Sequence, residues 1–195
     1  MQANQQSPIT AQSNLPRCIT IGVWVSLGLV VVWVAGSLRF FAFPSVMTSQ
    51  DQVGSVDAVY ILGAATDERL AAGVELVEST SSDQLVVTVT PGNPLHRFCA
   101  EDHDFTVHCV TPDPVSTRGE ARQWADLAQR QQFDSVAIVT MRPHATRTMG
   151  YFERCFGGNI HVVDDQVLSF SALEWGKQFI YETGAMFKFV ASKGC

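Results

Sequence analysis

Hydrophobic and polar positions form alternating blocks along the chain, and these blocks predict strands followed by helices. A short apolar run bounded by turn residues is typical of a buried strand, and apolar residues three and four positions apart are typical of a helix. The apolar runs predict strands over residues 57–62, 85–89, 107–110, 135–140 and 160–163. The helical spacing predicts helices over residues 67–78, 116–132, 144–156 and 171–191.

This alternation predicts an α/β domain with a mainly parallel sheet. The strands are apolar along their whole length, so both faces of the sheet should be covered. In an open doubly wound sheet, a ligand binds at the C-terminal ends of the strands, near the point where the strand order reverses. Polar side chains that follow the strands are therefore the first candidates for a functional site.

One apolar block is too long for a strand or an ordinary buried helix. Residues 18–38 are 21 consecutive residues without a charge, bracketed by Arg17 and Arg39. At 1.5 Å per residue, a helix of this length spans roughly 31 Å, which matches the roughly 30 Å hydrocarbon core of a bilayer. The block therefore predicts a transmembrane helix. A cleaved signal peptide is the alternative, because residues 34–36 are small, but the apolar run is long for one.

The membrane helix divides the chain into segments. We expect a disordered cytoplasmic tail over residues 1–17, the transmembrane helix over 18–38, a juxtamembrane linker over 39–55 and the α/β domain over 56–195. One arginine on each side of the helix gives no positive-inside bias. The first 16 residues are polar and carry no charged side chain, which is typical of a short cytoplasmic tail. This predicts a single-pass plasma-membrane protein with an extracytoplasmic domain.

The cysteines of the domain favour the same side of the membrane. Cys99, Cys109, Cys155 and Cys195 lie within the 151 residues that follow Pro44, and this content is more typical of an oxidising compartment than of the cytosol. Cys99 and Cys109 would close a short loop and are the favoured pair, although sequence alone does not fix disulfide connectivity. Four free thiols in a domain facing the cytosol are the alternative.

The charge of the domain excludes one large class of partner. The residues after Pro44 carry 11 basic and 19 acidic side chains, a net charge of −8, whereas a nucleic-acid-binding domain needs a basic face. We therefore expect no nucleic-acid partner. A local cluster of basic residues can still attract an anion, because charges act mainly within a Debye length of about 8 Å.

A first polar cluster follows the strand predicted over residues 57–62. Gly63 and the small residues after it would let a ligand approach the backbone, and the next helix presents free N–H groups to an anion. Arg69 lies about one turn into that helix. A plain tight turn and a solvated arginine explain the same residues equally well, because the further glycines of a dinucleotide-binding fingerprint are absent.

A second cluster opens the helix predicted over residues 116–132. Ser116 or Thr117 can cap this helix, and Thr117 with Glu120 has the spacing of a capping box, which explains both residues without any function. Arg118 is not explained in this way. A cation in the first turn opposes the helix dipole, so Arg118 needs an anionic partner.

A third cluster follows the strand over residues 135–140. Thr140 ends the strand, and His144 and Arg147 lie three residues apart on the next helix, so they share a face. An imidazole and a guanidinium that converge at a strand end suit a phosphate or a carboxylate. A structural pairing of the two side chains is the alternative interpretation.

Five further residues raise the question of a metal. These are His96, Asp102, His103, Asp104 and His108. Their spacing is irregular and forms no compact ligand motif, so we expect a solvated, disulfide-closed loop and no metal site. The sequence indicates no particular cofactor.

Taken in this order, the three clusters resemble the SanA/ElyC/YdcF-like family, a bacterial domain family of poorly defined biochemistry. The resemblance runs from about residue 57 to residue 163, through DAVYILGAATDERLAAGVEL, STRGEA and VTMRPHATRTMGYFERCFG, with a weaker similarity around Trp175 and residues 182–186. The chain departs from the family pattern after the second strand, where PGNPLHRFCAEDHDF replaces a glycine-rich turn and a Glu-Ala helix start. Ligand identity should therefore not be transferred from the family.

The resemblance implies a Rossmann-like three-layer sandwich that is often membrane-anchored and faces the cell envelope. It also implies a role in cell-envelope or peptidoglycan homeostasis, including lipid-linked precursors, without an established reaction. On this basis the leading hypothesis is binding of an anionic, phosphate-bearing small molecule, for which a lipid-linked glycan precursor is one candidate. The expected ligand-binding residues are Gly63, Arg69, Ser116, Thr117, Arg118, Thr140, His144 and Arg147.

Two other functions stay open. One is a hydrolase or transferase acting on a phosphate-linked or nucleotide-type substrate, with His144 as general acid or base and Glu120 as its partner or as a second acid–base group. S-adenosylmethionine is a ligand variant of this site, because Rossmann-like sheets suit adenosine. The other is a noncatalytic interaction protein that docks through apolar residues of the last helix, although core packing explains the same residues.

Overall fold

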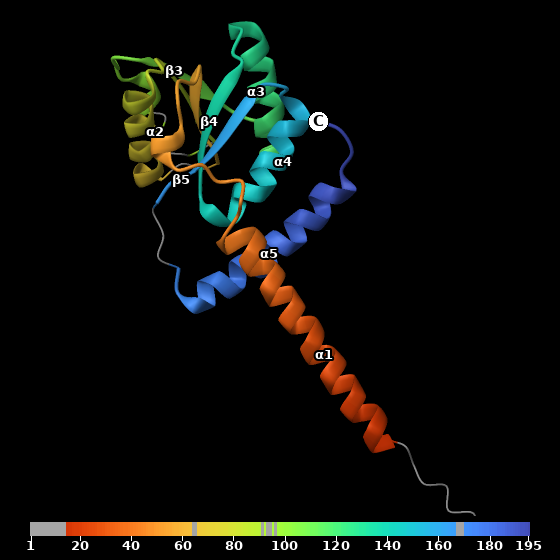
Figure 1. Cartoon of the computed structure of the whole chain (residues 1–195). Coiled ribbons are helices and arrows are strands. Elements are labelled where there is room, and N and C mark those ends of the chain that lie inside the picture. Colours follow the sequence, from red (N-terminus) through yellow and green to blue (C-terminus); the bar gives the residue numbers. More distant parts are fainter. Residues whose placement is uncertain (1–14, 64–65, 91, 93–94, 96, 167–169) are drawn as a thin grey trace, which may run out of the picture. The chain divides into compact units, whose positions relative to one another are not determined.

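The computed structural model describes residues 15–63, 66–90, 92, 95, 97–166 and 170–195 (Figure 1). Contacts divide the chain into two units, residues 1–36 and 37–195. The first contains most of helix α1, Leu15–Ser37. The segment Ile19–Ala42 is long and apolar enough to cross a membrane, a property that N-terminal signal sequences share. Residues 1–14 of the predicted tail lie outside the described residues.

The second unit is an α/β domain with a five-stranded parallel sheet, which confirms the predicted fold class. The strands are β1 (Ala58–Ile61), β2 (Gln84–Thr88), β3 (Thr106–Val110), β4 (Ser135–Thr140) and β5 (Asn159–Asp164). They lie in the order β3-β2-β1-β4-β5, and every neighbouring pair is parallel. The strand order therefore reverses between β1 and β4, where a doubly wound sheet binds its ligand.

Helices cover both faces of the sheet (Figure 1). One face packs against α2 (Asp67–Thr80) and against the described part of the β2–β3 crossover, which contains the short 3₁₀ helix Phe98–Ala100. The other face packs against α3 (Thr117–Gln131) and α4 (Ala145–Cys155), and Trp124 of α3 is fully buried there. These layers form the expected three-layer sandwich.

The juxtamembrane segment packs on the domain. Its first residues form the π-helical turn η1 (Leu38–Ala42), and Phe41 and Ala42 are buried against Phe179 of α5 (Ala172–Ala191). Further along, the N–H of Thr48 donates to the carbonyl of Val162 at 2.8 Å. The linker therefore covers the outer edge of β5, which would otherwise expose unpaired backbone groups.

Two disulfides close the domain. Cys99 bonds to Cys109, the pair favoured by the sequence, and Cys155 at the end of α4 bonds to Cys195. The first fixes the irregular β2–β3 crossover to β3, and the second ties the residues after α5 to α4.

Candidate functional site

A buried carboxylate lies at the point where the strand order reverses. Glu120 reaches from α3 toward the end of β1, and its Oε1 accepts the Gly63 N–H at 2.6 Å and the Thr88 hydroxyl at 3.0 Å. Gly63 has φ +75°, a backbone conformation that favours glycine. Thr140 ends β4 beside this point, and its hydroxyl is buried without a hydrogen-bond partner among the described residues. Polar groups therefore gather where the topology predicts a site.

The capping box expected from Thr117 and Glu120 is wrong. Ser116 is the N-cap, because its hydroxyl accepts the Gly119 N–H at 3.2 Å. Helix α3 thus begins one residue earlier than the box requires, and Glu120 turns inward toward the sheet. Thr117 instead accepts a hydrogen bond from Arg147 at 2.6 Å. Both residues belong to the polar cluster and do not cap the helix.

Gly119 explains how the loop before α3 packs so closely against the first turn of that helix. A Cβ at this position would lie 2.0 Å from the Pro114 carbonyl oxygen, a contact with backbone that no side-chain movement relieves. Glycine therefore allows the preceding loop to lie against the helix, and this contact sets the positions of Thr117 and Glu120.

The Glu120 carboxyl is electrostatically unusual. It is 4% exposed, and burial raises its pKa above the ordinary 4.5. The hydrogen bonds from Gly63 and Thr88 and the positive charges of Arg147 and Arg69 offset only part of this effect. Both arginines therefore act on one carboxyl, although they come from different helices and different faces of the sheet.

Replacement of Glu120 by glutamine should change how stability depends on pH. Because its folded-state pKa is raised, Glu120 contributes stability at low pH that is lost as the pH rises through that value. Glutamine keeps an oxygen acceptor for Gly63 and Thr88 and removes the titration. We therefore expect the unfolding temperature of Glu120→Gln, relative to that of wild type, to increase as the pH rises from 4 to 8. Each unit of difference between the folded-state and unfolded-state pKa of Glu120 corresponds to about 1.4 kcal/mol. A difference that is the same at every pH would contradict this assignment.

Arg147 is the centre of a second set of contacts. Its Nε donates to Glu182 Oε2 at 2.9 Å and its Nη2 donates to Glu182 Oε1 at 3.1 Å, a bidentate pair that fixes the guanidinium plane. Its Nη1 donates to Thr117 at the N-terminus of α3. The Arg147 side chain is 11% exposed and that of Glu182 is fully buried. Arg147 therefore joins α3, α4 and α5 at one position.

His144 contacts the same carboxylate. Its Nδ1 pairs with Glu182 Oε1 and also lies 2.9 Å from Arg147 Nη2. The expectation that Glu120 would be the partner of His144 is corrected here, because α5 brings Glu182 to the imidazole. Burial opposes the charged form of Glu182, but hydrogen bonds from His144 and Arg147 and their positive charges lower its pKa overall.

Arg69 forms another buried ion pair. Its Nε donates to Asp165 Oδ2 at 2.7 Å and its Nη1 donates to the Leu62 carbonyl at 2.9 Å. Arg69 is 7% exposed, so the solvated arginine that the sequence left open is excluded. Its guanidinium ties the end of β1 to the residue that follows β5.

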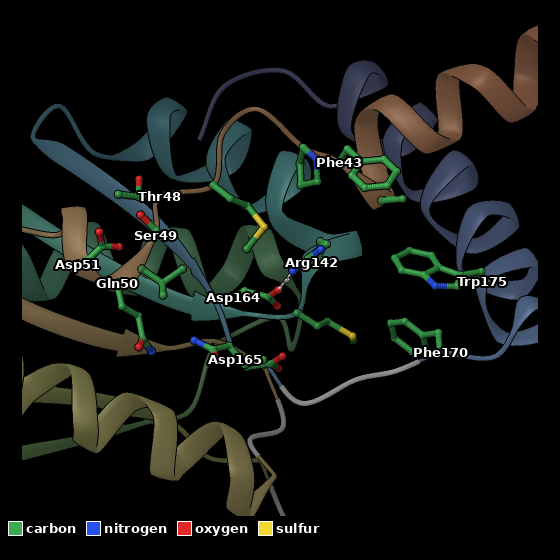
Figure 2. Close-up of a pocket in the computed structure, with 16 residues that line it drawn as sticks. Phe43, Thr48, Ser49, Gln50, Asp51, Arg142, Asp164, Asp165, Phe170 and Trp175 are labelled. Carbon is green, nitrogen blue, oxygen red and sulfur yellow. Dashed lines mark hydrogen bonds and ion pairs between the residues drawn. The ribbon is translucent and has the colours of Figure 1, made fainter.

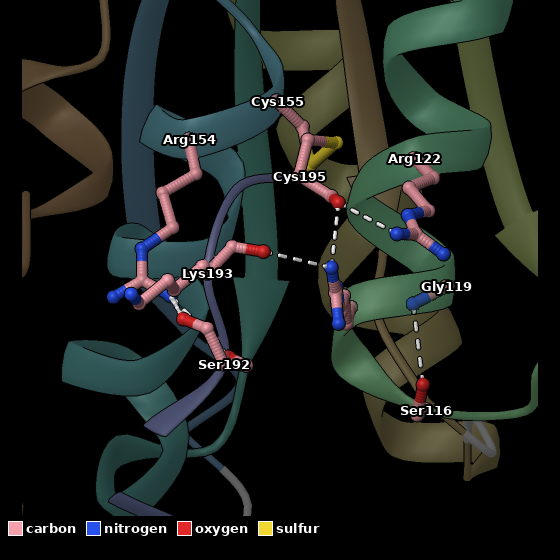
Figure 3. Close-up of a disulfide and its surroundings, with 9 residues drawn as sticks. Ser116, Gly119, Arg122, Arg154, Cys155, Ser192, Lys193 and Cys195 are labelled. Carbon is pink, nitrogen blue, oxygen red and sulfur yellow. Dashed lines mark hydrogen bonds between the residues drawn. A yellow bond between two sulfur atoms is a disulfide. The ribbon is translucent and has the colours of Figure 1, made fainter. Parts of the chain in front are cut away.

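Arg118 lies apart from this cluster. Its Nη2 donates to the carbonyls of Lys193 and Cys195 at 3.0 and 2.8 Å, and Arg122 donates to the same Cys195 carbonyl at 2.6 Å. Figure 3 shows this segment, which the bond between Cys155 and Cys195 ties to α4 and the two arginines bind to α3. The partners of Arg118 are thus backbone carbonyl oxygens and not the anion expected from the sequence.

A cavity of about 930 Å³ opens beside the cluster (Figure 2). The linker, the ends of β4 and β5 and the first turn of α5 form its walls. Phe43, Phe170 and Trp175 lie on one side, and Asp51, Asp164, Asp165 and Gln166 contribute polar groups. Arg142 pairs with Asp164 at its edge. None of the residues predicted for ligand binding lines this cavity, but Asp165 connects it to Arg69.

Two of the five residues considered for a metal, His103 and His108, make other contacts. His103 lies between two phenylalanine rings, with Nε2 2.8 Å from the Phe98 carbonyl, and His108 Nε2 contacts Gln84 Oε1 at 2.8 Å. His96 lies outside the described residues. No group of three potential metal ligands occurs within the part of the chain that the structure describes.

The structure therefore adds three residues to the predicted site and separates Arg118 from it. Gly63, Arg69, Thr88, Thr140 and Glu120 gather at the β1–β4 reversal, with Thr117, His144 and Arg147 next to them, while Ser116 caps α3. Thr88, Glu182 and Asp165 were missed. For the two acids, the signal was an acidic residue in an apolar helix or at the end of a strand, which indicates a buried ion pair.

Comparison with known proteins identifies no relative of this chain: no known family, curated protein or solved structure matches it.

Proposed function

We propose that this chain is a membrane-anchored envelope protein that binds an anionic, phosphate-bearing small molecule at the β1–β4 reversal and acts in cell-envelope or peptidoglycan homeostasis. The motifs that resemble the SanA/ElyC/YdcF-like family occupy this position in the fold. The two disulfides support an extracytoplasmic domain, because such bonds persist in oxidising compartments.

The contacts of Arg147 carry the proposal. The guanidinium is held in one orientation by Glu182 and Thr117, beside His144 and the N-terminus of α3. The ion pairs of Arg147 with Glu182 and of Arg69 with Asp165 are balanced in charge. An anion would therefore be recognised by fixed N–H and O–H donors, by the helix dipole and by the His144 imidazole.

The neighbouring cavity suits the remainder of a lipid-linked glycan. Sugars present apolar ring faces together with hydroxyl groups, and aromatic side chains beside carboxylates and amides match both features. The aromatic surface for the ring faces comes from Phe43, Phe170 and Trp175. The polar groups for the hydroxyls come from Asp51 and Gln166. The linker forms one wall of the cavity, so the cavity lies near the point where the chain leaves the predicted membrane span.

A second candidate function is hydrolysis or transfer of a phosphate-linked or nucleotide-type substrate. The pairing of Glu182 with His144 Nδ1 favours it, because a carboxylate at one imidazole nitrogen orients the ring and leaves the other nitrogen for proton transfer. Glu120 is the second acid–base group of this hypothesis. Turnover with a bell-shaped pH profile that disappears in His144→Ala would support it, and binding without turnover would exclude it for the ligand tested.

Thermal unfolding of the full chain in a mild detergent tests the binding proposal. The ligand panel is inorganic phosphate, a short isoprenyl phosphate, a nucleotide sugar and S-adenosylmethionine. A ligand present at 100 times its dissociation constant should stabilise the protein by about 2.7 kcal/mol. We expect this shift with one phosphate-bearing class, and we expect Arg147→Ala to remove it.

Two variants make the result specific. Arg130→Ala removes a positive charge from an exposed position at the other end of α3 and should keep the ligand-induced shift. Arg147→Lys keeps the charge but loses the bidentate geometry, so it should reduce the shift. Each variant is compared with itself without ligand, which separates binding from stability. An undiminished shift in Arg147→Ala for every phosphate would show that the anion does not bind here.

A further inference from the structure

We infer that α5 lies on the bilayer surface and inserts its outer face among the lipid headgroups. This inference rests on the membrane anchor of the proposed function and is independent of the anion site. It concerns the exposed apolar side chains of α5, which the packing of the domain does not use.

The two faces of α5 differ in what they contact. Phe179 and Glu182 face the domain, where Phe179 packs against the linker and Glu182 binds Arg147. Leu173, Ile180 and Phe187 follow one another at intervals of seven residues, which is two helical turns, so they share one face. They are 71%, 67% and 73% exposed. Core packing therefore does not explain these three residues.

The connection to the membrane span identifies what covers this face. Helix α1 ends at Ser37, and only four residues later Phe41 is buried against Phe179, with ring centroids 6.3 Å apart. The Thr146 hydroxyl also donates to the carbonyl of Phe40 at 2.6 Å. With the anchor of the proposed function in the bilayer, this short connection keeps α5 close to the point where the chain leaves it.

The composition of the exposed face matches a lipid interface. Phe40 and Phe43, on either side of the buried part of the linker, are 54% and 70% exposed. Lys177 and Lys188 are exposed on α5 beside the apolar residues. An interfacial helix combines large apolar side chains, which enter the headgroup region, with lysines, which reach the phosphates. A lipid surface accommodates both the apolar side chains and the lysines, whereas contact with water leaves the apolar side chains hydrated.

Site-specific photocrosslinking of the full chain tests this inference. The photoreactive residue benzoylphenylalanine replaces Ile180 or Phe187, one position at a time, in vesicles of phosphatidylethanolamine and phosphatidylglycerol that carry alkyne-tagged acyl chains. Both positions are exposed, so the fold should be retained, and far-UV circular dichroism checks this. We expect tagged lipid on both variants, at least several times more than on a variant labelled at Gln131, an exposed position at the far end of α3.

A label at Val30 in α1 separates the possible failures. Val30 labelled and residues 180 and 187 unlabelled would overturn the inference and leave the anchor intact. Val30 unlabelled would overturn the anchor and this inference together. A crosslink of position 180 or 187 to a second copy of the chain, or equal lipid labelling at Gln131, would also overturn the lipid assignment.

Discussion

Replacement of Glu182 by alanine is expected to lower the free energy of unfolding by about 3–5 kcal/mol at neutral pH. The Glu182 side chain is fully buried, and Arg147 and His144 both contact its carboxylate. Alanine removes the carboxylate and leaves the Arg147 guanidinium nearly buried without its partner. Urea denaturation of the full chain in a mild detergent, followed by tryptophan fluorescence, measures the change.

The loss should depend on pH. The contacts with His144 and Arg147 lower the pKa of Glu182 below 4.5 in the folded state, in spite of its burial. A lowered pKa contributes stability above the ordinary value, and the contribution disappears as the pH falls through the folded-state pKa. The difference between wild type and Glu182→Ala should therefore shrink below about pH 4.5.

Two variants distinguish the buried ion pair from a general effect of charge. Glu153 is an exposed acid on α4, and Glu153→Ala should change the free energy by no more than about 0.5 kcal/mol. The double variant Glu182→Leu with Arg147→Met removes both charges and should recover much of the loss. Equal losses in Glu182→Ala and Glu153→Ala would contradict the structural role of Glu182.

The strands and helices of the domain follow from local patterns. The run predicted over residues 85–89 is β2, Gln84–Thr88, and the other strands agree equally closely. Burial on both faces makes β1, β2 and β4 nearly continuous apolar runs, which is a signal that needs no long-range information. The linker lacks such a signal. Its structure depends on contacts such as that of Phe40 with Thr146, more than 100 residues away, which no local pattern encodes.

The sequence predicts the location of the site more accurately than it predicts the contacts within the site. Topology requires residues that follow β1 and β4 to meet, so Gly63 and Thr140 could be placed at one edge. The ion-pair partners of Arg69 and Arg147 could not be predicted in this way, because the acids that bind these arginines lie 96 and 35 residues further along the chain. Arg118 shows the same limit: its need for a partner was evident, but the carbonyl of Cys195 was not.

Loss of the bond between Cys155 and Cys195 is expected to lower the free energy of unfolding by about 4 kcal/mol, more than loss of the bond between Cys99 and Cys109. The bonds join residues 40 and 10 positions apart. In the chain-entropy account, stabilisation increases with loop length, from about 3 kcal/mol for 15 residues to about 4.7 kcal/mol for 100. The longer bond also holds the Cys195 carbonyl that accepts hydrogen bonds from α3.

Paired alanine variants of each disulfide, unfolded in urea, measure the two contributions. An equal or larger loss for the pair Cys99 and Cys109 would contradict the expected order. Thiol counting in protein denatured directly from cells then tests the side of the membrane. The chain has five cysteines, so two disulfides leave one thiol reactive before reduction and five after it. Five reactive thiols before reduction would place the domain in a reducing compartment and contradict its extracytoplasmic location.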